Sequence, residues 1–336
     1  MGVERIVSKN PRKNPKLHTQ KAPKGYVLKG VSTLLDSDGK VSSQWLKTTR
    51  APMEPKDIRK IYSKMCADLQ SAHKPVPLDG PVDEDLCCIY PLGDPHFGSL
   101  CWWRETGGKS WDLKIAQETH LAAITKLVDI APRANIAVLA NLGDLIHADG
   151  YKGTTYAGTP VDTDGRWPKI LRAATGAMVT MVTTMLAKHE LVLVESVRGN
   201  HDEQSSIVVA EILRAHFRSD PRVIIRDNVR VHTYQTFGKC MFGFHHGDKT
   251  KAANLPLLMA TDEPALWGST EHRMWYTGHV HHETRKEFPG CDVETFGTLA
   301  PQDAWHAGQG YRAKQRARVD VWHKQHGRVA RYEVMP

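Results

Sequence analysis

Five short apolar runs, each followed closely by glycine together with Asp, Asn or His, constrain this sequence more than any other feature. The runs are 86–92, 135–142, 190–197, 239–245 and 274–277. Stretches with helical periodicity lie between or beside them, at 113–131, 166–188, 205–217 and 251–261. Such alternation predicts an α/β (α+β) fold in which strands lie between layers of helices. Because ligands of such sheets collect at the carboxyl ends of strands, the polar residues after each run form the candidate site.

The five motifs carry residue types that bind metal ions. They are G-D-P-H at 93–96, N-L-G-D at 141–144, R-G-N-H-D at 198–202, F-H-H-G-D at 244–248 and G-H-V-H at 278–281. In the last of them, His279 and His281 share one face of an extended segment. Each motif alone is compatible with a capped turn or a surface histidine. Five in succession make chance a poor explanation, so we expect one shared site.

The series resembles the calcineurin-like metallophosphoesterases, whose pattern is D-x-H, G-D, G-N-H-D or G-N-H-E, a His beside Gly, and G-H-x-H. The match covers residues 93–281. The resemblance implies a two-layer β-sandwich flanked by helices, and two divalent metal ions. It assigns one ion to Asp94, His96, Asp144 and His281, and the other to Asp144, Asn200, His246 and His279.

The resemblance also implies catalytic roles. His201 would be the proton donor to the leaving oxygen, and His147 occupies a slot, often Asp in the family, that supports the catalytic histidine. Two divalent ions supply a nucleophilic oxygen and neutralise phosphate charge. Mixed Asp, Asn and His ligands favour Mn, with Fe, Zn, Ni or Mg as alternatives. The sequence therefore predicts a metal-dependent phosphoesterase, an enzyme that hydrolyses phosphoester bonds.

The substrate is predicted from two loops and one strand end. Residues 99–112 interleave aromatic and cationic side chains, which can stack bases and contact phosphates; an alternative is that these tryptophans are buried. Residues 150–165 form a glycine-rich loop that is a candidate rim of the site. The predicted substrate contacts are Arg198, Trp102, Trp103, Arg104 and Tyr151.

Three functions compete for this site. The second and third motifs are similar to those of the DNA-repair exonuclease branch, so a nuclease acting on DNA is the leading hypothesis. Separately, the lysine-rich N-terminal arm gives the chain a weaker likeness to phage-encoded phosphoesterases. The first rival is a phosphoesterase acting on nucleotides, cyclic nucleotides or other small phosphoesters. The second is a non-catalytic scaffold, which is disfavoured because every motif position is filled.

Charge is unevenly distributed along the chain. The formal net charge is +8, but residues 1–30 carry +7, residues 310–336 carry +5, and the middle carries −4. The basic ends fit arms that touch a phosphate backbone, and they equally fit a solubilising tail. The sparse cysteines and the lack of a signal peptide or membrane span predict a cytoplasmic protein. A homo-oligomer is left open.

The regions outside the motifs predict the domain organisation. Residues 1–24 are rich in Lys, Pro and Asn and read as a flexible arm, followed by a hairpin within 26–50 and a helix at 54–72. Prolines at 75–81 mark a linker, and a second hairpin is expected at 315–323 and 328–335. We therefore divide the chain into an extension, 1–85, and a catalytic domain, 86–336.

Overall fold

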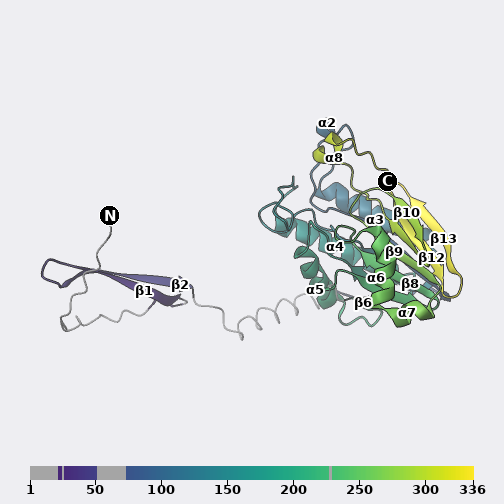
Figure 1. Ribbon diagram of the computed structural model, residues 1–336, viewed down its shortest axis with the longest axis horizontal. Helices are drawn as coiled ribbons and strands as arrows, with labels where there is room; N and C mark the ends of the chain where they lie inside the picture. The colour runs from purple at the N-terminus through teal and green to yellow at the C-terminus, as the bar shows by residue number, and fades with distance from the viewer. Residues whose placement is uncertain (1–21, 25, 51–72, 227–228) are drawn as a thin grey trace. The chain divides into compact units, whose positions relative to one another are not determined.

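The computed structural model describes residues 22–24, 26–50, 73–226 and 229–336. The chain divides into two compact units, Met1–Met65 and Cys66–Pro336, and each is described by itself (Figure 1). The predicted helix at 54–72 lies wholly outside the described residues, as does most of the predicted arm at 1–24. The division between residues 85 and 86 stays a prediction.

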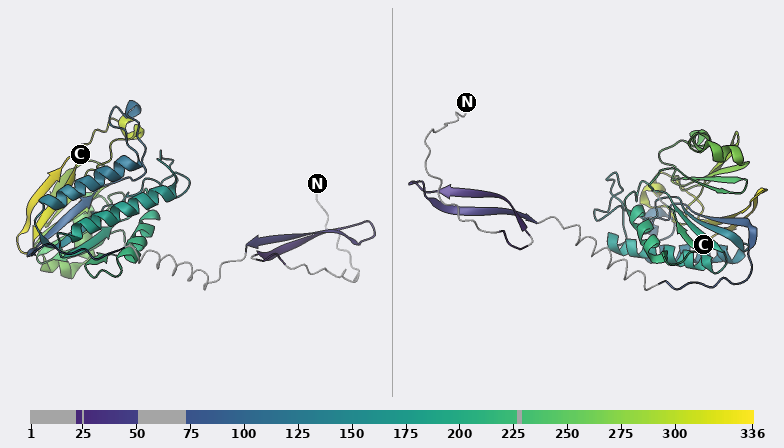
Figure 2. Two further views of the ribbon diagram at one scale, coloured as in Figure 1. Left: turned by 180° about the vertical axis from the view of Figure 1, so that it is seen from behind. Right: turned by 90° about the horizontal axis from the view of Figure 1, so that it is seen from below.

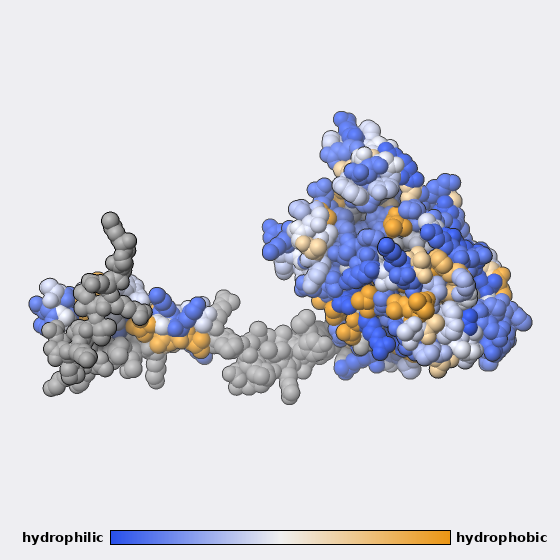
Figure 3. Space-filling model, in the orientation of Figure 1, coloured by the Kyte–Doolittle hydropathy of each residue, from blue (hydrophilic) through white to orange (hydrophobic). Residues whose placement is uncertain are grey.

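The first unit contains the expected hairpin. Strand β1 (Tyr26–Leu35) pairs antiparallel with β2 (Val41–Arg50). The carboxylate of Asp36 shapes the turn by accepting hydrogen bonds from the main-chain N–H groups of Asp38 and Lys40, at 3.0 and 2.8 Å. Apolar side chains such as Leu34 and Trp45 stay exposed on it, and Figure 3 shows this apolar surface. Such exposure is expected, because two strands alone bury little surface.

The second unit is built on two sheets. The six-stranded sheet has the order β13-β12-β3-β4-β5-β6, in which β3 to β6 are parallel to one another and β12 pairs antiparallel with both β3 and β13. Its strands are β3 (Asp83–Leu92), β4 (Ala134–Asn141), β5 (Leu191–Ser196), β6 (Val223–Ile225), β12 (Ala317–His323) and β13 (Gly327–Val334). The last two confirm the hairpin predicted near the end of the sequence.

The five-stranded sheet has the order β10-β11-β9-β8-β7, with β8, β9 and β11 parallel. Its strands are β7 (Thr233–Phe237), β8 (Cys240–His245), β9 (His272–Thr277), β10 (Thr284–Phe288) and β11 (Cys291–Thr295). Sequence periodicity had not indicated β6, β7, β10 or β11, because these strands are short or partly exposed.

Helices cover the outer face of each sheet (Figure 2). The six-stranded sheet is covered by α3 (Leu113–Ile130), α4 (Trp167–Leu186) and α5 (Ser205–Phe217). The five-stranded sheet is covered by the 3₁₀ turn η1 (Ala252–Asn254), α6 (Leu255–Asp262) and α7 (Pro264–Ser269). Two short helices, α2 (Trp103–Thr106) and α8 (Ala304–Gly308), lie beside each other at one end (Figure 1). The predicted sandwich flanked by helices is confirmed.

The alternation of side chains along each strand explains the layers. In β3, Cys87 and Ile89 face the interior between the two sheets, whereas Cys88 and Tyr90 face the helices. In β9, Tyr276 points into the interior between the sheets and Trp275 toward α6. Strands that are buried on both faces read as unbroken apolar runs, which is why the sequence revealed them. None of the helices in the described part of the chain has the length and apolar character that crossing a membrane requires.

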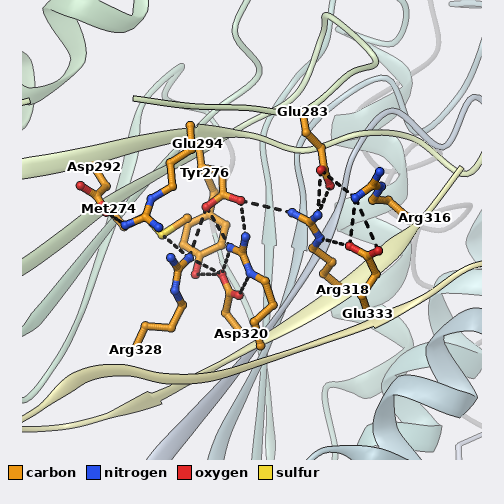
Figure 4. A network of polar contacts seen from close by, with 12 residues as sticks. Met274, Tyr276, Glu283, Asp292, Glu294, Arg316, Arg318, Asp320, Arg328 and Glu333 are labelled. Atoms are coloured by element: carbon orange, nitrogen blue, oxygen red, sulfur yellow. Dashed lines mark hydrogen bonds and ion pairs between the residues drawn. The ribbon is translucent and has the colours of Figure 1, made fainter. Parts of the chain in front are cut away.

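A network of ion pairs ties β12 and β13 to the five-stranded sheet (Figure 4). The buried carboxylates of Glu294 and Asp320 both accept hydrogen bonds from Arg328 and Arg331. Arg318 forms ion pairs with both Glu294, at 3.4 Å, and Glu283, at 2.7 Å. These arginines supply much of the +5 charge of residues 310–336, so that charge is largely engaged within the fold.

Candidate metal centre

The predicted ligands meet where parallel strands of both sheets end. Strands β3, β4 and β5 from one sheet, and β8 and β9 from the other, each lead directly into one of the five motifs. Contacts cross from sheet to sheet: the Asp94 carboxylate lies 3.7 Å from His281 Nε2, and Asn200 Oδ1 lies 3.0 Å from His246 Nε2. The structure therefore brings all seven predicted ligand residues together at one edge of the sandwich.

The backbone at this edge adopts a conformation that L-residues rarely take. In the described part of the chain, five residues other than glycine have positive φ, between 45° and 74°. All five are predicted metal ligands: Asp94, His96, Asp144, His279 and His281. Such conformations cost on the order of 1–3 kcal/mol each and concentrate at functional sites. The fold thus tolerates local strain to aim these side chains at one point.

The ligand atoms form two groups. Asp94, His96 and His281 make one, and Asp144, His246 and His279 make the other, with ligand atoms inside each group within 4.8 Å of one another. The Oδ2 atom of Asp144 lies 3.3 Å from His246 Nε2 in its own group and 3.9 Å from His96 Nε2 in the other. Asp144 therefore stands between the two groups, as a ligand shared by two cations would.

Neighbouring groups hold the ligands in place. His246 Nδ1 lies 2.8 Å from the main-chain oxygen of Leu142, which leaves Nε2 facing Asp144 and Asn200. The Asp94 carboxylate accepts the main-chain N–H of His279 at 2.9 Å. Asp202, fully buried, accepts the main-chain N–H groups of Asp144, Ile146 and Gly199 at 3.0 to 3.2 Å. Such support is typical of metal sites, where outer groups fix ligand orientation.

His201 is positioned by its neighbours and borders the site. Its Nδ1 lies 2.8 Å from the main-chain oxygen of His147 and donates to it, so Nε2 is the nitrogen available to a substrate. Its main-chain N–H donates to Asp144 Oδ1 at 2.8 Å. The ring of His147 stacks on that of His201 at 5.1 Å, and its Nδ1 lies 3.1 Å from His96 Nδ1. His147 thus contacts His201 through its main-chain oxygen and its ring, and it contacts the predicted ligand His96 through Nδ1.

Electrostatics in the site depart strongly from those in water. Burial raises the pKa of Asp94 to about 8, although the nearby charge of His246 acts to lower it. Burial alone would raise the pKa of Asp144 too, but interactions with His246 and His201 together outweigh it and hold that pKa below its usual range. Burial lowers the pKa of His281 to about 3, and neighbouring imidazoles add to that effect. Such shifts are common where ionisable groups converge on a functional site.

The donor set fits divalent cations. His96 Nε2 faces His281 Nε2 at 3.0 Å, and burial with neighbouring imidazoles pushes the pKa of His96 well below its usual range. Neutral imidazoles therefore direct lone pairs toward the same space as buried carboxylate oxygens. A cation placed there would satisfy these groups, and nitrogen with oxygen ligands suits Mn, Fe, Zn or Ni.

A cavity of about 890 Å³ opens over the site. Asp144, Asn200, His201 and His281 lie among the residues that line it. Residues 155–162 of the glycine-rich loop contribute to the lining, in agreement with the predicted rim, and residues 303–313 contribute another part. A phosphoester in this cavity would lie against the ligand groups and His201.

The five predicted substrate contacts do not line this cavity. Arg198 instead donates to the main-chain oxygen of Val229 at 2.9 Å and pairs with Glu203. Trp102 and Trp103 are about half exposed, and Arg104 lies over their rings at 5.9 and 5.3 Å. Tyr151 is exposed against Trp167. Loop composition marked the aromatic residues and Arg104, and a strand end marked Arg198, but neither signal indicates which way a side chain faces.

Sequence reasoning missed the segment after the last motif. Asp303, Trp305, His306, Tyr311 and Arg312 all line the cavity, and the ring of His306 stacks on that of His281 at 4.7 Å. The segment has no periodic pattern, and α8 is only five residues long. Its one signal was the grouping of Asp303, Trp305 and His306 within four residues.

No protein-family model matches the chain, and no curated protein does. Solved structures with a similar arrangement include the phosphoesterase YfcE of E. coli, with 14% identity, a TM-score of 0.36, and coverage of 73% of this chain and 98% of that one. A novel archaeal phosphodiesterase has 12% identity, a TM-score of 0.37, and coverage of 74% and 99%. Zinc-complexed Vps29 of Entamoeba histolytica has 13% identity, a TM-score of 0.31, and coverage of 74% and 98%. At these scores the comparisons add nothing to what the geometry supports.

Proposed function

We propose that the chain is a two-metal phosphodiester hydrolase. The observation that carries this proposal is the position of Asp144, whose carboxylate stands between two groups of buried ligands at the floor of an open cavity. One ion would be held by Asp94, His96, Asp144 and His281, and the other by Asp144, Asn200, His246 and His279. Mn is the proposed metal, with Fe, Zn, Ni and Mg as alternatives.

The bound ions would supply charge neutralisation and an activated nucleophilic oxygen. The chain's own residues would orient the substrate and manage its protons. His201 donates through Nδ1 to a main-chain oxygen, so its ring cannot turn without losing a hydrogen bond. Its Nε2 is the proposed proton donor to the leaving oxygen. Because His147 supplies that oxygen and contacts His96, we propose that it positions both rings.

For the substrate we propose DNA, with nucleotides, cyclic nucleotides or other small phosphoesters as the alternative. The DNA proposal rests on the motif resemblance and on the basic residues before residue 30. The alternative is favoured by the engagement of the C-terminal arginines in ion pairs. A scaffold role is disfavoured, because a binding surface has no need of strained backbone at five ligand positions.

A panel of substrates tests the reaction class. The protein with Mn²⁺ would be incubated with single- and double-stranded DNA, bis-p-nitrophenyl phosphate and p-nitrophenyl phosphate. We expect hydrolysis of the diester to exceed that of the monoester and to stop when metal is chelated. Monoester turnover without DNA cleavage at any salt concentration would exclude the nuclease. Absence of turnover on all four substrates, with any of the candidate metals, would exclude the enzyme.

The proton donor is tested by the His201→Gln variant. General acid catalysis contributes typically about 10²- to 10⁴-fold, and it matters most when the leaving group is a poor one. We therefore expect a large loss of kcat on an alkyl phosphodiester and a much smaller loss on bis-p-nitrophenyl phosphate. The matched control is His282→Gln, since His282 lines the cavity but belongs to neither ligand group. Equal losses on both substrates would argue against His201 as the donor.

A further inference from the structure

The cavity wall formed by residues 305–311 carries an aromatic surface. Trp305 is 61% exposed and Tyr311 is 52% exposed, and both line the cavity. Their ring centroids are 6.1 Å apart and their planes are inclined by 34°. Exposed apolar side chains that are grouped together, unlike single scattered ones, can mark an interaction site, and this pair borders a candidate active site.

Hydrogen bonds hold the main chain that carries this surface. Asp303 accepts hydrogen bonds from the main-chain N–H and from Nδ1 of His306, at 2.8 and 2.7 Å. Tyr311 donates its main-chain N–H to the His306 oxygen at 3.0 Å. Arg312 spans the segment by donating to the main-chain oxygens of Ala307 and Tyr311, at 3.2 and 2.7 Å. A main chain that is already ordered lowers the entropic cost of binding a ligand.

The aromatic surface is continuous with the metal centre. The ring of His306 stacks on His281 at 4.7 Å, and the ring of Trp305 meets His306 edge-on at 4.9 Å. A phosphate at the ligand groups is therefore separated from the Trp305 face by one intervening ring. That spacing suits a flat group joined to the phosphate through a sugar, rather than a ring bonded directly to it.

The polar groups around this surface suit a nucleotide. Arg312 lines the same cavity and brings a permanent positive charge to it. Thr155 and Thr159 line it as well and offer hydroxyl groups that can hydrogen-bond to a base or sugar. Aromatic faces beside a cation are the usual elements of base recognition without strict sequence preference.

We propose that Trp305 and Tyr311 form a nucleobase-binding subsite, which makes a nucleoside phosphodiester the substrate class of the candidate metal centre. This inference rests on the proposed hydrolase function but replaces the substrate contacts predicted from sequence. The base lies against Trp305 and Tyr311, and the phosphate lies at the ligand groups. The subsite serves a nucleotide at a DNA end and a free dinucleotide equally.

Binding tests the subsite independently of turnover. Thymidine 5′-monophosphate and inorganic phosphate would be titrated calorimetrically into the Mn²⁺-loaded protein. We expect Trp305→Ala and Tyr311→Ala each to weaken the nucleotide by about 5-fold or more relative to phosphate, the range typical of one lost stacking contact. Trp45→Ala, which removes a tryptophan of similar exposure from the β1–β2 hairpin, should leave the ratio of the two affinities as in the wild type. If the ratio of nucleotide affinity to phosphate affinity is the same in the wild type and in all three variants, the subsite is overturned.

Turnover separates this inference from the function on which it rests. Thymidine 5′-p-nitrophenyl phosphate and methyl p-nitrophenyl phosphate share a leaving group and differ only in the nucleoside. We expect the wild type to prefer the thymidine ester in kcat/KM, and Trp305→Ala to reduce that preference. Hydrolysis of both esters without a preference would overturn the subsite and leave the hydrolase intact. If neither ester is hydrolysed, the function fails, and the calorimetric ratio still decides whether the subsite exists.

Discussion

The carboxylate of Asp144 accepts the main-chain N–H of His201 at 2.8 Å, so one side chain joins the proposed proton donor to both ligand groups. Asp144→Asn preserves the shape of this side chain but removes its charge and one ligand oxygen. We expect metal content, measured by elemental analysis after desalting, to fall at both sites. We also expect hydrolysis to fall by at least about 100-fold.

The matched control for that change is Asp162→Asn. Asp162 also lines the cavity, but it belongs to neither ligand group. Its substitution should keep the metal content of the wild type. Asp144→Asn protein that retains both ions would contradict the shared-ligand role.

Gly199 is required by the space that Asp144 occupies. A Cβ atom at Gly199 would lie 2.0 Å from Asp144 Oδ1 and 2.2 Å from its main-chain nitrogen, and Asp202 holds that nitrogen in place. Gly199→Ala should therefore displace Asp144, abolish activity and lower the free energy of unfolding by about 1–3 kcal/mol. Urea denaturation monitored by circular dichroism would measure the change.

Gly176 offers the opposite case for comparison. It lies exposed within α4, and a Cβ atom there would meet nothing within 4 Å. Gly176→Ala should raise the free energy of unfolding by up to about 1 kcal/mol, because alanine favours helix. If the two variants changed the free energy of unfolding in the same direction, the close approach at Gly199 would not be destabilising to an added Cβ atom.

Arg331 compensates two buried carboxylates, Glu294 and Asp320, whose side chains are 3% and 0% exposed. Arg331→Met would leave them short of a partner, and removing one member of a buried ion pair typically costs about 3–5 kcal/mol. Arg285→Met is the control, since Arg285 is 46% exposed and pairs with Asp292 at the surface. An exposed pair contributes at most about 1 kcal/mol. If Arg331→Met and Arg285→Met unfolded with similar urea midpoints, the ion-pair network would have no stabilising role.

The strands that carry the site could be predicted because they are buried on both faces and end in residue types that seldom follow a strand together. The positive φ angles at Asp94 and His279 could not be predicted, since they depend on contacts between segments more than 180 residues apart, such as the hydrogen bond from His279 to Asp94. Chain position likewise gave no sign that Arg318 would pair with Glu283.

The substrate-facing wall was the least predictable part. Trp102 and Trp103 lie at the start of α2 and Trp305 lies in α8, so all three are tryptophans at short helices. What distinguishes Trp305 is the stack of His306 on His281, which links the end of β9 to α8. Such a contact follows from how the loops close over the sheet edge, and no local pattern encodes it.

Stability should depend on pH through His120, which is buried between α3 and the rings of Phe97 and Trp111, away from the ligand groups. Burial lowers its pKa from 6.5 to about 4, despite the hydrogen bond with the Ala116 oxygen. Above pH 6.5 neither state holds the proton. As the pH falls from 6.5 toward 4, the unfolded chain takes up a proton that the folded chain excludes, so stability is lost across that window.

The His120→Gln variant removes this linkage. Whatever the difference in free energy of unfolding between variant and wild type at pH 7, it should shift in favour of the variant by about 2 kcal/mol between pH 7 and pH 5. Urea denaturation with a chelator present would measure this without interference from metal binding. His326→Gln alters an exposed histidine and should show a constant difference. A constant difference for His120→Gln as well would mean that the folded protein accommodates the charged imidazole.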